Sequence, residues 1–256
     1  MTPAPLADLD GWIGSVDKES RRLARAASEV GLDAAVPSCP GWRVRDVVQH
    51  LGGVHRWASA HIVERRTQGM PKPEEERLMS SLPEDAALLD WFEMGHTALV
   101  QALSEAPRNL SCWSFLPAPT PLAFWARRQA HETEIHRADV ELAGPNPPTP
   151  FPLELAADGI EELLFGFAAR IRRTKLTQEH RIALLPRDLS QPWLVRLGPE
   201  GVRATRGSGD ADCTLRGSVS ELYLFSWNRI PASALSVEGN AAATSHWASA
   251  VRVTWA

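Results

Sequence analysis

A proline-rich segment just past the middle of the chain constrains the fold more than any other feature. Four of the seven residues at positions 144–150 are proline. Proline lacks an amide hydrogen, so a segment this dense in proline ends any helix. Before this segment the apolar residues recur every three to four positions, and after it many of them alternate. We therefore predict two domains, residues 1–148 and residues 149–256.

The N-terminal domain is expected to be helical. Its apolar residues form the stripe of an amphipathic helix in four segments, as Leu9, Trp12, Val16 and Leu23 do in the first. The four helices are predicted at residues 5–30, 44–66, 83–106 and 121–142, with a turn-rich stretch at 36–42 and a loop at 70–76. Four amphipathic helices in succession indicate a helical bundle.

The C-terminal domain is expected to mix helices and strands. Short apolar runs bounded by Gly, Pro, Asp or Ser are typical of strands. They occur at residues 182–185, 193–197, 202–205, 213–215 and 235–237. Helices are predicted at 153–172, 218–228 and 241–251, and a hairpin turn at 197–202. The sequence therefore indicates a smaller α+β domain after the bundle.

Composition excludes several classes of protein. The chain has 256 residues, 44% of them hydrophobic, and 27 Lys+Arg against 31 Asp+Glu give a formal charge of −4. These values argue against long disorder and, because the charges nearly balance, against a nucleic-acid partner. No run approaches the roughly 18 apolar residues of a membrane-spanning helix, and the N-terminus has no signal-peptide pattern. We therefore expect a cytoplasmic protein with no membrane partner.

Histidine and glutamate residues on two predicted helices have the spacing of a metal site. Glu132 and His136 are four residues apart, which places both on one helix face, about 6 Å apart along the axis. His50 lies between Val47 and Leu51, so we expect its ring to point partly into the bundle. Two imidazoles and one carboxylate suit a divalent first-row metal, most often zinc, and leave a position open for water or a substrate atom.

Spacing alone also allows a purely structural interpretation. In that case His50 is a hydrogen-bonded core histidine, and Glu132 and His136 are simply neighbours on a polar face. His131 and Glu134 lie close enough in the sequence to compete as ligands. Other reactive residues, to which no functional role is assigned, are Cys39, His55, His61, His96, His180 and His246.

Three blocks of the sequence resemble the mycothiol-dependent maleylpyruvate isomerase family. They are VPSCPGWRVRDVVQHL at 36–51, RQAHETEIHR at 128–137 and LYLFSWNR at 222–229. The resemblance spans nearly the whole chain. It implies an α+β protein in which a DinB-like, metal-binding up-down four-helix bundle is followed by a smaller α+β domain.

The same resemblance implies roles for individual residues. It assigns the metal ligands to His50, Glu132 and His136, and a catalytic arginine to Arg229. The family more often has a glycine where this chain has Asn228.

The activity implied by the resemblance is that of a metal-dependent, thiol-using enzyme. The cofactors are a divalent metal, Zn²⁺ above all, and mycothiol as the thiol cosubstrate. The metal-activated thiolate attacks an unsaturated or otherwise electrophilic small acid. Two alternatives stay open: a mycothiol S-transferase or detoxifying enzyme, and a non-catalytic module that binds metal or thiol.

Overall fold

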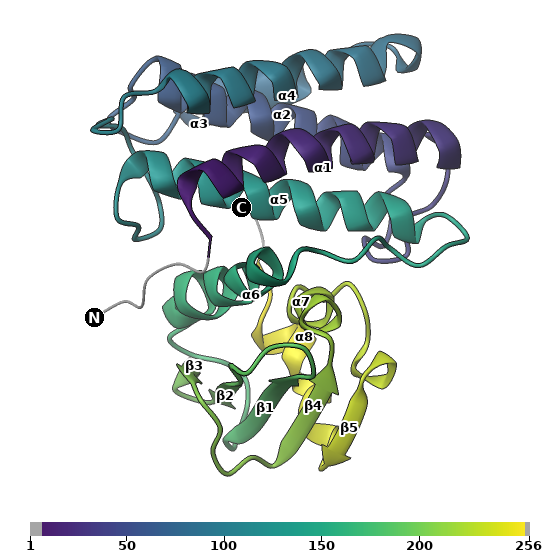
Figure 1. Ribbon diagram of the computed structural model, residues 1–256, viewed down its shortest axis with the longest axis vertical. Coiled ribbons are helices and arrows are strands. Elements are labelled where there is room, and N and C mark those ends of the chain that lie inside the picture. Colours follow the sequence, from purple (N-terminus) through teal and green to yellow (C-terminus); the bar gives the residue numbers. More distant parts are fainter. Residues whose placement is uncertain (1–6, 254–256) are drawn as a thin grey trace. The chain divides into compact units, whose positions relative to one another are not determined.

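The computed structural model describes residues 7–253, which divide into two compact units (Figure 1). One unit is Ala7–Thr149, and the other begins at Pro150. The division therefore falls inside the proline-rich segment 144–150. No helix among residues 7–253 is long and apolar enough to cross a membrane.

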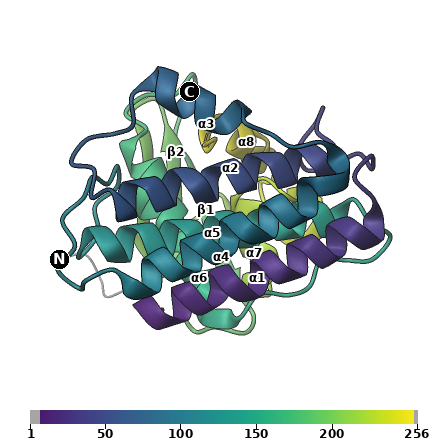
Figure 2. The same cartoon turned by 90° about the horizontal axis from the view of Figure 1, so that it is seen from above.

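The first unit is a four-helix bundle, as the sequence predicts. Figure 2 shows its four long helices running side by side. Helix α1 packs against α5 and α4, and α2 packs against α4 and α5. Their bounds are α1 Leu9–Val30, α2 Val44–Val63, α4 Leu88–Glu105 and α5 Pro121–Leu142.

Local sequence explains where these helices begin and what they bury. The Asp8 side chain accepts a hydrogen bond from the Gly11 amide at the start of α1, and Thr120 does the same for Ala123 at the start of α5. Pro121 is tolerated there because the first helical position needs no amide donor. The apolar stripes then meet in a fully buried core that includes Leu23, Val47, Leu51, Phe92 and Val140.

Two segments of this unit differ from the prediction. Residues 70–76 were expected to form a loop, but most of them belong to a short helix, α3, Lys72–Ser80. None of the residues of α3 is buried, so it lacks the apolar stripe by which a helix is recognised in sequence. The third long helix begins at Leu88 rather than at residue 83, because a short 3-10 turn, Asp85–Ala87, precedes it.

The second unit is built on a five-stranded mixed sheet (Figure 1). The strands lie in the order β3-β2-β1-β4-β5, and every neighbouring pair is antiparallel except β1 and β4. Their bounds are β1 His180–Pro186, β2 Trp193–Gly198, β3 Gly201–Arg206, β4 Cys213–Gly217 and β5 Ser236–Gly239. Its helices are α6 Leu153–Glu161, α7 Val219–Ser226 and α8 Trp247–Ala250.

The predicted hairpin joins β2 to β3. Gly198 pairs with Gly201 across the turn, and Gly201 has a φ of +102°, which favours glycine over any residue with a side chain.

The predicted helix at 153–172 is less regular than expected. It continues from α6 as a π-helical turn, Glu162–Phe167, and then a 3-10 turn, Ala168–Arg170.

Candidate metal-binding site

Three of the residues singled out in the sequence converge inside the bundle. His50 comes from α2, whereas Glu132 and His136 come from α5. Oε1 of Glu132 lies 3.2 Å from Nε2 of His50 and 3.3 Å from Nε2 of His136. One potential ligand atom from each residue lies within 4.8 Å of the other two. Residues 82 positions apart in the chain thus meet in one small site.

Helix packing brings the three side chains together. The spacing of four residues places Glu132 and His136 on one face of α5. His50 is flanked on α2 by the fully buried Val47 and Leu51. Its own side chain keeps 20% of its surface exposed, whereas that of Glu132 keeps 6%. His50 therefore lies at the edge of the core, between the buried carboxylate and solvent.

Charge partners keep Glu132 ionised. Burial opposes ionisation, but the guanidinium of Arg128 and hydrogen bonds with His136 and His50 outweigh it and hold the pKa of Glu132 well below its usual range. Arg128, itself buried, donates to Oε2 of Glu132 at 2.8 Å. Oε1, the oxygen that faces the two imidazoles, is left as a ligand atom.

A second carboxylate orients His136. Nδ1 of His136 donates a hydrogen bond to Oδ2 of the fully buried Asp139 (2.9 Å), and the hydroxyl of Ser38 donates to Oδ1 (2.6 Å). Burial lowers the pKa of His136, but the bonds to Asp139 and Glu132 outweigh burial and raise it to about 9, so that without a metal both ring nitrogens carry a proton at neutral pH. A metal ion that displaces the Nε2 proton would find the ring already oriented, because Asp139 holds the other proton on Nδ1.

An indole ring covers the two imidazoles. Trp42, from the turn before α2, lies edge-on to His50 with 5.3 Å between ring centroids. It also stacks on His136 at 6.3 Å, with the ring planes 13° apart. The histidine rings are therefore restrained by packing as well as by hydrogen bonds.

The three residues fit a divalent metal by their chemistry and by their spacing. Neutral imidazole nitrogen and carboxylate oxygen are common zinc ligands, with bonds of about 2.0–2.1 Å. Two such ligand atoms in a tetrahedral arrangement lie about 3.3 Å apart. The two distances from Glu132, 3.2 Å and 3.3 Å, match that separation.

The competing residues named in the sequence are engaged elsewhere. Nδ1 of His131 lies 3.3 Å from Oε2 of Glu134, whose Oε1 accepts a hydrogen bond from Ser15 of α1 at 2.6 Å. His55 is fully buried against Thr133. His61 is buried among three tryptophan rings, which belong to Trp57, Trp113 and Trp125.

Two residues that the sequence analysis did not assign to the site turn out to adjoin it. Asp139 and Arg128 contact His136 and Glu132, respectively. Their spacing was a usable signal, because Asp139 lies three residues after His136 and Arg128 four residues before Glu132. Cys39, to which the sequence analysis assigned no role, has its sulfur 3.5 Å from Oδ2 of Asp139.

Arg229 belongs to the second unit and follows α7. Its Nη1 donates to the carbonyl of Trp227 at 2.7 Å. The residue before it, Asn228, has a φ of +61°, a left-handed conformation that glycine adopts freely and asparagine tolerates better than most residues. The Asn228 side chain donates to the carbonyl of Val251 at 2.8 Å. This backbone conformation explains why a glycine suits the position.

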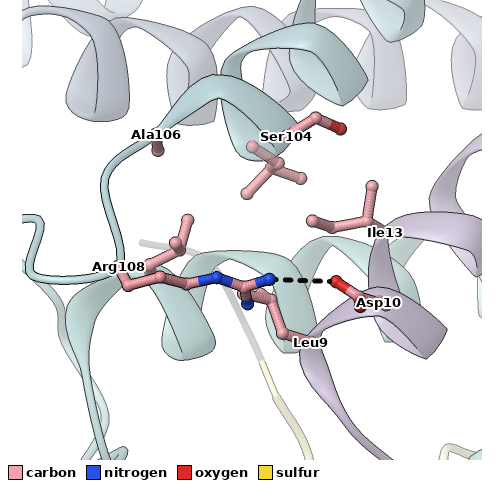
Figure 3. Close-up of a pocket in the computed structure, with 8 residues that line it drawn as sticks. Leu9, Asp10, Ile13, Ser104, Ala106 and Arg108 are labelled. Carbon is pink, nitrogen blue, oxygen red and sulfur yellow. Dashed lines mark hydrogen bonds and ion pairs between the residues drawn. The ribbon is translucent and has the colours of Figure 1, made fainter.

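A separate cavity lies at the end of α4 and involves none of the three converging residues (Figure 3). Its walls are largely aliphatic, and an exposed ion pair between Asp10 and Arg108 (3.4 Å) crosses it. Ser104 is the one hydroxyl side chain among its lining residues, and the metal-ligating group of His50, Glu132 and His136 lies elsewhere in the bundle. The lining residues are Leu9, Asp10, Ile13, Leu103, Ser104, Ala106, Arg108 and Leu122.

Comparisons with known proteins agree with this architecture. The family model of the mycothiol maleylpyruvate isomerase N-terminal domain matches residues 14–141, and that of the family's C-terminal domain matches residues 154–246. No match was found among curated proteins.

Two solved structures share the fold. A crystal structure of the mycothiol-dependent maleylpyruvate isomerase has a TM-score of 0.61 at 14% identity, over 92% of this chain and 96% of that chain. A histidine-to-alanine mutant of the mycothiol-dependent maleylpyruvate isomerase has a TM-score of 0.62 at 13% identity, with the same coverage. With a family model matching each of its two units, the chain belongs to the mycothiol maleylpyruvate isomerase family.

Proposed function

We propose that the protein is a metal-dependent enzyme in which His50, Glu132 and His136 bind Zn²⁺ and mycothiol serves as the thiol cosubstrate. The reaction is the cis–trans isomerisation of a small unsaturated diacid. The observation that carries this proposal is the convergence of two imidazoles on an ionised, buried carboxylate, in a chain of a family named for mycothiol and maleylpyruvate.

The chain's own residues would prepare the site for the thiol. Bound zinc lowers the pKa of a thiol, so that the thiolate is present at neutral pH. Arg128 keeps Glu132 charged, and Asp139 holds one proton of His136 on Nδ1, so that Nε2 is the nitrogen turned toward a metal. Trp42 packs on both imidazole rings and restrains them. The partial exposure of His50 leaves a route for a small molecule.

The isomerisation needs only addition and elimination at one double bond. The thiolate sulfur bonds to one alkene carbon, and the alkene electron pair moves toward the conjugated carbonyl. The remaining carbon–carbon bond then rotates. Elimination breaks the carbon–sulfur bond, restores the double bond in the other geometry and returns the thiol unchanged.

Arg229 is proposed to hold a carboxylate of the substrate. A guanidinium can bind a carboxylate through two parallel hydrogen bonds, which the ammonium of lysine cannot do. We expect Arg229→Lys to raise KM for the diacid at least tenfold while leaving the metal content unchanged. An unaltered KM would remove Arg229 from the substrate site.

The metal assignment is tested by metal analysis of protein purified without chelators. The wild-type chain should carry about one equivalent of divalent metal, and His50→Ala should lose most of it. His246→Ala, in the other unit, is the matched control and should bind metal as the wild type does. Equal metal content in wild type and His50→Ala would refute the proposed ligand set.

The reaction is tested by following the diacid and mycothiol in the same assay. An isomerase converts the diacid while the total thiol stays constant. Stoichiometric loss of mycothiol with an epoxide or a halide would favour the S-transferase alternative instead. Bound metal and bound thiol without turnover of any electrophile would favour the non-catalytic module.

A further inference from the structure

An open, solvent-facing cavity of about 400 Å³ lies beside His50 on the first unit. Side chains from three consecutive segments line it: the turn before α2, the first half of α2, and α3. The lining residues are Gly41, Trp42, Asp46, Gln49, His50 and Met79. Because the imidazole of His50 belongs both to this cavity and to the converging triad, a molecule in the cavity can extend one group to the metal-binding atoms.

The lining combines an aromatic face with polar side chains on one face of α2. Asp46, Gln49 and His50 are spaced three and four residues apart, so they point the same way. Oδ2 of Asp46 accepts a hydrogen bond from the Arg43 amide at 2.7 Å. The Gln49 amide is half-buried and has no hydrogen-bond partner among residues 7–253, so it can both donate to and accept from a ligand.

The charge of the cavity selects the kind of ligand. Asp46 is the one acid among the lining residues, and no lysine or arginine lines the cavity. Asp46 therefore disfavours a carboxylate bound beside it. An uncharged group rich in hydroxyls fits better, because its hydroxyls can pair with Asp46 and Gln49 while a ring packs on the indole of Trp42.

We propose that this cavity holds the polyhydroxylated part of the thiol cosubstrate while the sulfur reaches the metal-binding triad. The inference rests on the proposed function and extends it, because it gives the thiol and the acidic substrate different approaches to the metal-binding residues. The thiol enters along α2 and α3, and the acidic substrate is excluded from this side. Gln49 is thereby a specificity-determining residue for the thiol.

Helix α3 forms one wall of this cavity. Met79 of α3 forms a wall of the cavity and packs closely on α2 at Gly53. A Cβ atom on Gly53 would lie 2.7 Å from the Met79 sulfur, so a larger residue there would push α3 away. The lack of buried residues in α3 is consistent with a helix that serves as a wall rather than as part of the core.

The test compares two thiols that differ in the polyhydroxylated part. Cobalt-substituted protein is titrated with mycothiol and with N-acetylcysteine, which lacks the sugar and inositol rings, and binding is read from the thiolate-to-cobalt absorption band. In the wild type, mycothiol should bind at least tenfold more tightly than N-acetylcysteine. Gln49→Leu should weaken mycothiol binding about five- to tenfold and leave N-acetylcysteine binding unchanged, because one or two hydrogen bonds are lost.

A control variant and the cobalt content distinguish a failure of the thiol cavity from a failure of the proposed function. Gln101→Leu, on the exposed face of α4, should leave both titrations unchanged. Cobalt content measured on each variant shows that the triad is intact. Equal affinity of the wild type for the two thiols, or an equal loss for both in Gln49→Leu, would overturn the thiol cavity while leaving the proposed function in place. The absence of any thiolate band would overturn both.

Discussion

At His136, a neighbouring carboxylate decides which ring nitrogen is available to a metal. Asp139 accepts the Nδ1 proton and is held in turn by Ser38. Partners of this kind orient the ligand ring and raise its basicity, and their loss commonly costs 10- to 100-fold in metal affinity. A residue that contacts no metal can therefore control how tightly the metal binds.

We predict that Asp139→Asn weakens zinc binding at least tenfold, because the amide is a poorer acceptor for the Nδ1 proton and favours the wrong tautomer. The measurement is competition with a chromogenic chelator. Asp10→Asn, at an exposed position of α1, is the control and should bind zinc normally. Wild-type affinity in Asp139→Asn would show that His136 is oriented by packing alone.

Asn228 shows how a single backbone angle restricts a sequence. Its left-handed φ of +61° is easy for glycine, acceptable for asparagine and strained for a β-branched residue. We predict that Asn228→Val lowers the free energy of unfolding by about 1–2 kcal/mol relative to Asn228→Gly. Urea denaturation of the two variants checks this difference. Equal stability would mean that the backbone relaxes at this position without cost.

At the scale of elements, Gly52 allows α2 to approach α4 closely. A Cβ atom at Gly52 would lie 2.2 Å from Cζ3 of Trp91, a distance that no ordinary contact allows. Trp91 is itself covered by the guanidinium of Arg56, 3.8 Å from the ring centroid. The indole of Trp91 therefore occupies the space that a side chain at position 52 would need, and this contact fixes how α2 and α4 pack against each other.

Gly52→Ala should consequently lower the free energy of unfolding by about 1–3 kcal/mol, since the indole or the helix has to move. Gly14→Ala is the matched control in α1, where nothing lies within 4 Å of the added Cβ. That variant should gain about 0.5–1 kcal/mol from the higher helix propensity of alanine. Stabilisation by both substitutions would contradict the close packing of α2 on α4.

The connection between α2 and α4 shows a limit of pattern-based prediction. Helix α3 has no buried residue, and two acidic residues, Glu74 and Glu75, stand in its first turn. Negative charge at the N-terminal end stabilises a helix through the peptide dipoles. It adds nothing to the apolar periodicity by which a helix is recognised in a sequence. Contact with α2 is what gives this short segment a defined place.

At the scale of the whole bundle, buried histidines that stay neutral link stability to pH. Burial, followed by the nearby His96, lowers the pKa of His55 to about 3. Burial also lowers the pKa of His61 and of His96. In the unfolded chain these side chains take up a proton near pH 6.5, and in the folded chain His55 does so only near pH 3. The unfolded state therefore binds more protons between these values, and stability falls as the pH falls.

We predict that metal-free protein loses about 2 kcal/mol of stability through His55 between pH 6.5 and pH 5. His55→Gln, which has no proton to gain and can still bond Thr133, should show a correspondingly shallower dependence. Urea denaturation in the presence of a chelator, at several pH values, measures both. Parallel curves for the wild type and the variant would exclude His55 as the acid-sensitive group.

Much of the local structure could be predicted from the sequence. The four long helices, the five strands and the break at 144–150 all follow from side-chain periodicity and from proline. The predicted ends of the helices were less accurate, because tertiary packing decides how far a helix extends. The third long helix, for example, begins at Leu88 rather than at residue 83. Helix α3 was missed because an exposed helix leaves no apolar signal.

The sequence by itself determined that Glu132 and His136 share a helix face, because a spacing of four residues is a property of one helix. It did not determine that His50 meets them, or that Glu134 is engaged with Ser15 and His131 with Glu134 instead. That choice was made by the packing of α2 and α1 on α5, which joins residues more than 80 positions apart. Helical periodicity is local, whereas which helix faces meet depends on how the whole core packs, and only the tertiary structure decides that.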